Sequence, residues 1–367
     1  MIVIVDHARR LTAAERLLAT EDLAALVVAP SPDLAYLVGY DPMPLERPTL
    51  LALVPGESPR LLVPTLERPL ALDAPGAPEL EIVGWRDGQD PYAVLAGWLP
   101  PGSRVALGDR IWGVHVLALQ RAAPTVMWTS ARPVVGTLRA RKDPAELDAL
   151  RRAGAAADAA LEELLATAIA GRRELDIGAD LARLLVEYGH ERADFTIVAS
   201  GPNAASPHHE PTERVIAAGD ALVLDFGGVL DGYCSDTTRT FAIGEPSAEL
   251  TRVHAVVHEA QAAARASVRP GVEIQEVDRA ARAVIEAAGD GERFFHRTGH
   301  GIGLEVHEPP YAAEGDTTVL EPGMTFSVEP GIYMDGQLGV RIEDIVAVTD
   351  DGVEALNRSP RDLRIID

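Results

Sequence analysis

The chain has 367 residues, a formal net charge of −23 and one cysteine, Cys234. This length exceeds the size at which one hydrophobic core usually stops growing, so two domains are expected. The negative charge argues against binding to nucleic acid or to an anionic membrane, and the single cysteine excludes an internal disulfide framework and a thiolate zinc cluster.

No stretch approaches 18 consecutive apolar residues, and the first ten residues lack the basic region, apolar core and cleavage site of a secretory signal. The sequence therefore predicts a cytoplasmic protein without a membrane span. Lys142 is the only lysine among the 33 basic residues, so the Gly-Lys-Ser/Thr sequence of a P-loop is absent. Carboxylates and imidazoles are the side chains available to bind a metal, and they favour hard or borderline cations.

Residues 1–130 alternate apolar runs, such as Leu23–Ala29 and Thr49–Val54, with turn-rich breaks. This alternation predicts strands and helices of an α/β domain. A polar, basic stretch then ends at Asp143-Pro144-Ala145-Glu146, which is typical of a helix N-terminus with aspartate as the N-cap. We therefore predict a linker at 131–142 and a second domain at 143–367.

The second domain repeats one order of elements, two helices followed by strands. The predicted helices are 144–170, 174–188, 247–267 and 273–288, and the predicted strands fall at 195–199, at 221–242 and between 294 and 349. This order predicts an α+β domain with an internal duplication, in which each half contributes side chains to a shared cleft.

Four carboxylates interrupt segments that are otherwise apolar or β-branched, and they are Asp225, Asp236, Glu329 and Glu343. A turn around Asp231-Gly232 separates the two aspartates, so two strands folded back on each other could bring them to one site. Each aspartate alone is better explained as a turn or strand-end residue. Charges in buried strands are costly unless they are paired or bind a metal, so the set as a whole favours a metal site.

Three histidines follow one another closely, and they are His296, His300 and His307. Glycines surround them, which indicates a closely approached backbone rather than the apolar helix face that usually carries a core histidine. Four carboxylates and one neutral histidine carry a charge that two divalent cations would balance. Two ions about 3.5–4 Å apart can ionise a shared water near neutral pH and polarise a carbonyl, so the sequence predicts amide hydrolysis without a protein nucleophile.

These motifs resemble those of the pita-bread metallopeptidases, which include Xaa-Pro dipeptidase (prolidase), aminopeptidase P and methionine aminopeptidase. The matching motifs lie within residues 140–367 and are Ser200–His208, Leu224–Gly227, Ser235–Thr240, His296–Gly303, Val306–Glu308, Val328–Gly331 and Val340–Asp344. The N-terminal half looks like the smaller α/β creatinase-type domain that precedes the proline-specific members and that methionine aminopeptidases generally lack. The resemblance implies a pita-bread catalytic domain with pseudo-two-fold duplication after that domain, and a homodimer.

The resemblance also implies a ligand role for five residues. Asp225 would chelate one metal ion, Asp236 and Glu343 would bridge both ions, and His300 with Glu329 would complete the shell of the other ion. Glu329 would also shuttle the proton of the bridging water. Mn²⁺ is the expected metal, with Co²⁺ or Zn²⁺ as alternatives.

Four further residues match substrate-side positions of the family. His208 and His307 resemble the histidines that steady the scissile carbonyl oxygen and the tetrahedral intermediate. His296 and Arg341 resemble residues of the substrate pocket or of the surroundings of the ligands. For Arg341, an ion pair that orients a ligand carboxylate explains the residue as well as substrate contact does.

The resemblance implies hydrolysis of the Xaa-Pro bond in dipeptides, with aminopeptidase P activity on longer Xaa-Pro peptides as the alternative. Many prolidases carry an arginine shortly after the last histidine motif, but no arginine occurs from residue 308 to 340. We therefore predict that Arg47 binds the substrate carboxylate and that Asp41 positions it, against the alternative of an ordinary surface loop. A non-catalytic binding protein and a metal-free, creatinase-like amidine hydrolase fit the intact ligand set less well.

Overall fold

The computed structural model describes residues 6–367, which divide into two compact units, residues 6–139 and Ala140–Asp367. The strands of the first unit are β1 (Ala25–Val28), β2 (Leu50–Leu53), β3 (Arg60–Pro64), β4 (Glu81–Trp85), β5 (Arg104–Leu107) and β6 (Met127–Ser130). Its helices are α1 (His7–Thr20), α2 (Pro32–Val38), α3 (Arg68–Leu72), α4 (Pro91–Ala96) and α5 (Gly113–Ala122).

One mixed sheet with the order β4-β3-β2-β1-β5-β6 forms the centre of the first unit. The strand β1 pairs antiparallel with β2 and parallel with β5, and all four of its residues are buried. A short strand that is apolar throughout is typical of a sheet covered on both faces. The α/β architecture predicted for this region is therefore confirmed.

The stretch predicted as a linker contains two short helical segments, Arg132–Gly136 and α6 (Thr137–Ala140). It leads into α7 (Pro144–Leu165), where the Asp143 side chain accepts hydrogen bonds from the backbone N–H groups of Ala145 and Glu146, and the Glu146 side chain accepts one from that of Asp143. This reciprocal capping fixes the start of the helix at the predicted place.

The remaining helices of the second unit are α8 (Glu174–Glu187), α9 (Ala248–Ser267) and α10 (Gln275–Ala287). The strands of its first half are β7 (Arg192–Ser200), β8 (Ala221–Leu230), β9 (Tyr233–Cys234) and β10 (Thr237–Ile243). Those of the second half are β11 (Gly299–Gly301), β12 (Glu308–Ala312), β13 (Thr325–Val328), β14 (Gly331–Met334), β15 (Leu338–Arg341), β16 (Asp344–Val348), β17 (Val353–Ala355) and β18 (Arg364–Ile366).

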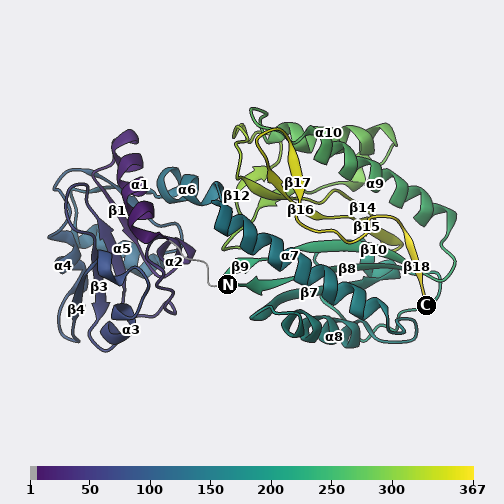
Figure 1. Cartoon of the computed structure of the whole chain (residues 1–367), viewed down its shortest axis with the longest axis horizontal. Helices are drawn as coiled ribbons and strands as arrows, with labels where there is room; N and C mark the ends of the chain where they lie inside the picture. The colour runs from purple at the N-terminus through teal and green to yellow at the C-terminus, as the bar shows by residue number, and fades with distance from the viewer. Residues whose placement is uncertain (1–5) are drawn as a thin grey trace. The chain divides into compact units, whose positions relative to one another are not determined.

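These strands form two larger sheets, β18-β10-β8-β7 and β12-β11-β13-β16-β17, and a small β14-β15 ribbon. In the first half, α8 packs on the first sheet through residues such as Leu181 and Phe226. In the second half, α10 packs through Ile285 against a core that includes Phe326. Figure 1 shows α9 and α10 along one side of the strands and α8 along the other, and the repeated order of elements confirms the predicted duplication.

The two longest helices of the described chain are α7 with 22 residues and α9 with 20 residues. Both bury one face and carry charged side chains on the other, as surface helices of globular domains do. Within residues 6–367, none of the helices has both the length and the apolar character that crossing a membrane requires.

Candidate metal centre

Each half of the second unit presents two carboxylates from one antiparallel strand pair. In the first half, Asp225 lies on β8 opposite Thr238 of β10, and Asp236 directly precedes β10. In the second half, Glu329 follows β13 and Glu343 directly precedes β16, which pairs with β13. The duplication therefore brings four predicted ligand residues to the junction of the two halves, where the backbone N–H of Glu343 donates to the Thr238 carbonyl at 3.0 Å.

The glycines beside His300 allow its strand to fit between two others. A Cβ atom on Gly299 would collide with the Ser327 carbonyl, and one on Gly301 would collide with the Glu308 carbonyl. The backbone N–H of His300 donates to Ser327 Oγ at 3.0 Å. The sequence pattern of a histidine between glycines therefore reflects close strand packing at the site.

The His300 ring faces the carboxylates with its Nε2 atom. Its Nδ1 atom lies 3.1 Å from the Gly301 carbonyl oxygen, which only accepts, so Nδ1 carries the proton. Nε2 lies 3.2 Å from Glu329 Oε1 and 3.7 Å from Asp236 Oδ2. Asp236, His300 and Glu343 offer ligand atoms that all lie within 4.8 Å of one another, so this buried group could hold a metal ion.

Two carboxylates are each held by the protein through one oxygen. Arg341 Nη2 donates to Asp225 Oδ2, and Thr238 Oγ1 donates to Glu343 Oε2 at 2.7 Å. The other oxygens, Asp225 Oδ1 and Glu343 Oε1, are buried and have no hydrogen-bond partner among residues 6–367. A buried anionic oxygen without a partner is costly, so this donor set fits a divalent cation.

The electrostatics of the site also favour added positive charge. Burial and the neighbouring carboxylates hold the pKa of Asp236 and the pKa of Glu343 well above their usual ranges. Burial raises the pKa of Glu329 as well, but the hydrogen bond and charge of His300 outweigh that effect and lower its pKa to about 2. Two divalent cations would relieve this mutual repulsion.

The histidines predicted to contact substrate lie beside this cluster. The His307 ring packs edge-on against the His300 ring at 4.1 Å between centroids, and burial and the charge of His300 lower the pKa of His307 to about 4. His208 is exposed and follows Pro207, whose carbonyl accepts from Arg341 Nη2 at 3.2 Å. His307 therefore lies against a predicted ligand residue, and His208 directly follows a residue that binds Arg341.

Arg341 and His296 belong to one chain of hydrogen bonds that ends at Asp225. His296 Nδ1 donates to the Arg297 carbonyl at 2.7 Å, so its Nε2 accepts from the Tyr333 hydroxyl at 2.9 Å. Arg341 Nη1 donates to the same hydroxyl at 2.8 Å. This geometry favours the ligand-orienting ion pair for Arg341, and Tyr333 is a member of the site that its aromatic, strand-like sequence did not indicate.

Two neighbours of the histidines have buried partners that sequence reasoning missed. Glu308 accepts from Lys142 Nζ at 2.7 Å, and each side chain is 2% exposed, so Glu308 does not face solvent. His209 Nε2 lies 3.0 Å from Glu174 Oε2. The only lysine of the chain thus anchors the segment directly after His307.

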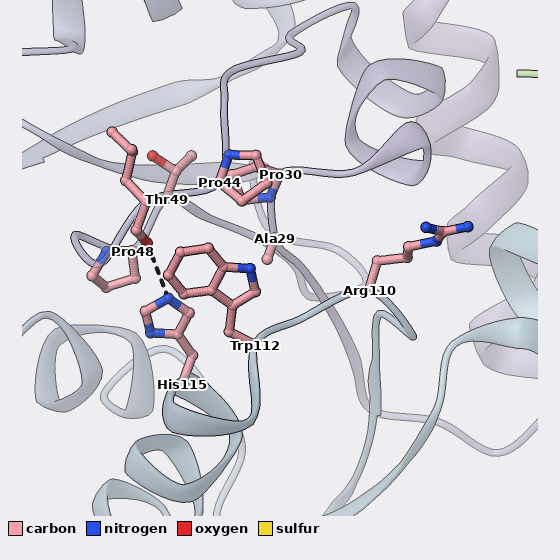
Figure 2. A pocket seen from close by; sticks show the side chains of 9 residues that line it. Ala29, Pro30, Pro44, Pro48, Thr49, Arg110, Trp112 and His115 are labelled. Carbon is pink, nitrogen blue, oxygen red and sulfur yellow. Dashed lines mark hydrogen bonds between the residues drawn. The ribbon is translucent and has the colours of Figure 1, made fainter. Parts of the chain in front are cut away.

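Asp41 and Arg47 lie in the first unit. Figure 2 shows the small pocket where His115 Nε2 donates to the Leu45 carbonyl at 3.2 Å, which fixes the loop between them. The Arg47 guanidinium pairs with Asp87, with both nitrogen–oxygen distances at 3.0 Å, while Asp41 is exposed. The role of Arg47 and Asp41 in substrate binding stays a prediction.

Two models of known protein families match the sequence. The model of Metallopeptidase family M24 matches residues 148–350, which is more than half of the chain and includes all five predicted ligand residues. The chain belongs to metallopeptidase family M24. The model of the Creatinase/Prolidase N-terminal domain matches residues 10–141 of this M24 enzyme. The predicted family, enzyme class and fold class are therefore confirmed.

Relatives match this M24 enzyme over nearly their whole length. It is 44% identical over 365 residues to the probable dipeptidase PepE of Mycobacterium tuberculosis, covering 98% of this chain and 96% of that protein. It is 35% identical over 345 residues to the Xaa-Pro dipeptidase of Lactobacillus helveticus, covering 91% and 92%. The crystal structure of recombinant prolidase from Thermococcus sibiricus matches with a TM-score of 0.92 and 34% identity, covering 99% and 100%.

Proposed function

We propose that this chain is a dinuclear-metal dipeptidase that hydrolyses the Xaa-Pro bond of dipeptides. The observation that carries the proposal is a pair of buried oxygens, Asp225 Oδ1 and Glu343 Oε1, that have no hydrogen-bond partner in the described chain. His300, whose Nε2 atom faces the carboxylates, belongs to the same buried group as Glu343. The names of the relatives, a probable dipeptidase and an Xaa-Pro dipeptidase, support the substrate class.

Asp225, Asp236, His300, Glu329 and Glu343 would hold two divalent cations, with Mn²⁺ first and Co²⁺ or Zn²⁺ as alternatives. Their four carboxylates balance the charge of two such ions. The oxygen-rich donor set suits hard or borderline metals. When bound, the ions supply a water that ionises near neutral pH and a Lewis acid for the peptide carbonyl.

Side chains of the protein would carry out proton transfer, stabilise the carbonyl oxygen and orient a metal ligand. Glu329, which accepts from Ser327 Oγ at 3.0 Å, would take the proton of the attacking water and pass it to the leaving prolyl nitrogen. His208 and His307 would donate hydrogen bonds to the carbonyl oxygen as it gains negative charge. Arg341 would hold Asp225 in its binding orientation.

Aminopeptidase P activity is the alternative. An aminopeptidase has a substrate pocket that is open at the far end, so that longer peptides fit. A dipeptidase needs a cation for the prolyl carboxylate, and the sequence between 308 and 340 offers no arginine for it. We propose Arg47 for this role, with Asp41 as its positioning partner. The homodimer and the cytoplasmic location likewise stay predictions.

The discriminating assay compares an Xaa-Pro dipeptide with the matching Xaa-Pro-Yaa tripeptide after loading with Mn²⁺. We expect kcat/KM for the dipeptide to be at least roughly tenfold higher, because a charge-assisted contact to the prolyl carboxylate is worth about 1.5–3 kcal/mol. Glu329→Gln serves as the inactive control. Comparable cleavage of both peptides would assign aminopeptidase activity, and no cleavage with Mn²⁺, Co²⁺ or Zn²⁺ would favour a binding protein.

A further inference from the structure

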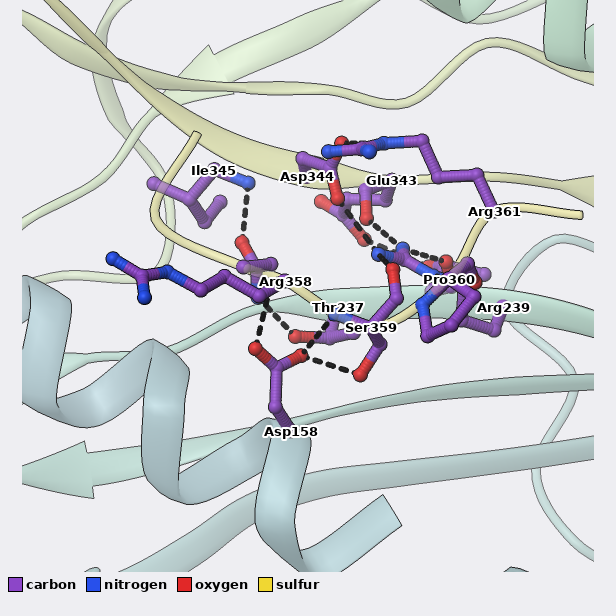
Figure 3. A network of polar contacts seen from close by, with 12 residues as sticks. Asp158, Thr237, Arg239, Glu343, Asp344, Ile345, Arg358, Ser359, Pro360 and Arg361 are labelled. Atoms are coloured by element: carbon purple, nitrogen blue, oxygen red, sulfur yellow. Dashed lines mark hydrogen bonds and ion pairs between the residues drawn. The ribbon is translucent and has the colours of Figure 1, made fainter. Parts of the chain in front are cut away.

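A short segment, residues 357–361, crosses between α7 and the strands β10 and β16, each of which directly follows a predicted ligand residue, and we call this segment the strap (Figure 3). On the α7 side, Asp158 accepts hydrogen bonds from the backbone N–H of Arg358 at 2.6 Å and from the backbone N–H of Ser359 at 3.1 Å. Ser359 Oγ also donates to Asp158, at 2.5 Å. The strap is therefore fixed to the helix that opens the second unit.

Arg239 on β10 connects the strap to the Glu343 segment. Its side chain is 2% exposed, so its charge and its N–H groups need partners within the protein. It donates to the carbonyls of Thr238 at 2.8 Å, Ser359 at 2.7 Å and Pro360 at 3.0 Å, to Asp344 Oδ1 at 2.8 Å, and to the carbonyl of Glu343. One guanidinium thus ties the backbone of a predicted ligand to both β10 and the strap.

Asn357 makes the corresponding connection to the Asp236 segment. Its Nδ2 atom donates to the Asp236 carbonyl at 3.1 Å and to Thr237 Oγ1. Its Oδ1 atom accepts from the backbone N–H of Ile345 at 2.7 Å, two residues after Glu343. A single buried amide therefore holds together the two segments that carry Asp236 and Glu343.

We propose that the strap sets the separation of Asp236 and Glu343, with Arg239 and Asn357 as positioning residues for the metal pair. This inference rests on the proposed dinuclear function. The two carboxylates come from opposite halves of the duplication and repel each other, so backbone hydrogen bonds have to keep them close enough to bind the same metal ions. Asn357 of the strap supplies such a bond at Asp236. Arg239, which also binds the strap carbonyls of Ser359 and Pro360, supplies one at Glu343.

Arg239 is also connected to the Glu343 carboxylate, through Thr238. Arg239 binds the Thr238 carbonyl, and the Thr238 hydroxyl donates to Glu343 Oε2 at 2.7 Å. A shift of this backbone therefore moves the Glu343 carboxylate as well as its main chain. Loss of partners that orient metal ligands typically weakens metal binding by about 10- to 100-fold.

The test is a Mn²⁺ titration of the metal-free full-length chain by calorimetry. Asn357→Ala and Arg239→Lys should weaken at least one of two Mn²⁺ sites by about 10- to 100-fold. Their kcat should recover at saturating Mn²⁺ with an unchanged KM for the dipeptide, which a general loss of structure would not produce. Arg358→Ala is the matched control, because this exposed side chain of the strap extends away from Arg239 (Figure 3).

Each outcome decides one question. Wild-type affinity for both ions in Asn357→Ala and Arg239→Lys would overturn the role of the strap and leave the proposed function standing. Failure of the wild-type chain to bind two ions would overturn the dinuclear function itself. If circular dichroism shows Arg239→Lys to be unfolded, Asp158→Asn, which loosens the strap only at α7, decides by the same titration.

Discussion

His254 is a buried histidine that should make the fold sensitive to acid. It lies on α9 with 4% of its surface exposed, and its Nε2 atom has no partner among the residues that the structure describes. Burial, and then the charge of His258, lower the pKa of His254 from 6.5 to about 4. The unfolded chain therefore binds this proton more readily, and stability is lost as the pH falls from about 6.5 towards 4.

We expect His254→Leu to remove this loss. Between pH 7.5 and 5.0, wild-type chain should lose about 2 kcal/mol more unfolding free energy than the variant, measured by urea denaturation at both values. His258→Gln, one turn further along α9, is the control and should keep most of the wild-type slope. Equal pH slopes for His254→Leu and wild type would show that this histidine is not the source.

Individual site residues differ in how far the sequence could predict them. For Asp225 and Glu343, the need for a buried partner could be predicted, because a carboxylate in or next to an apolar strand requires one wherever the strand lies. Tyr333 and Lys142 could not, because their roles depend on contacts to residues 37 and 166 positions away. Nothing in the local sequence of either residue distinguishes it from an ordinary aromatic or basic side chain.

The start of α8 fixes the loop that carries His208. Its first residue, Glu174, is completely buried and accepts hydrogen bonds from Ser200, Asn203, His209 and Thr212 at 2.7–3.1 Å. Burial alone would raise the pKa of Glu174, but the hydrogen bonds from these partners lower it to about 2. One ionised side chain therefore organises the segment that leads to a predicted substrate contact.

Glu174→Gln should loosen this loop without unfolding α8. An amide presents one acceptor where the carboxylate presents two, so we expect a destabilisation of about 2–4 kcal/mol and faster hydrogen exchange at residues 201–215. Hydrogen exchange read by mass spectrometry measures the effect. Glu187→Gln, at the exposed end of the same helix, is the control, and equal protection of the loop in both variants would contradict the role of Glu174.

The two ends of α7 show why the local sequence predicts only some helix boundaries. The start of α7 could be predicted from Asp143 and Glu146, because capping involves neighbouring residues. Its end could not, since α7 stops at Leu165, before the predicted 170, and the backbone N–H of Ile169 instead donates to the carbonyl of Asp367 at the C-terminus. Boundaries fixed by distant pairing carry no signal in the adjacent sequence.

The whole second unit should respond to metal through the repulsion among its buried carboxylates. Without ions, Asp225, Asp236, Glu329 and Glu343 raise the energy of the folded chain, whereas an ion that binds only the folded state stabilises it by about 2.7 kcal/mol at 100 times its dissociation constant. Chelation of metal should therefore lower the unfolding temperature. Removing one carboxylate should have opposite effects in the two conditions.

Asp236→Asn tests this reversal, because it removes one charge while keeping the shape of the side chain. In EDTA, the variant should unfold at a higher temperature than wild type, since one repulsive partner is gone. In excess Mn²⁺, it should unfold at a lower temperature, since a predicted bridging ligand is gone. Scanning calorimetry in EDTA and in excess Mn²⁺ measures this change of sign in the difference between the two unfolding temperatures.

The net charge of −23 requires a control for this comparison, because neutralising any acid reduces the general self-repulsion of the molecule. Glu79→Gln changes the charge equally at an exposed position of the first unit, and it should shift the unfolding temperature by the same small amount with and without Mn²⁺. If Asp236→Asn lowers the unfolding temperature by the same amount in EDTA and in Mn²⁺, the charge balance proposed for the site is wrong. A change of sign, seen at Asp236 and absent at Glu79, would tie the stability of the molecule to metal at these carboxylates.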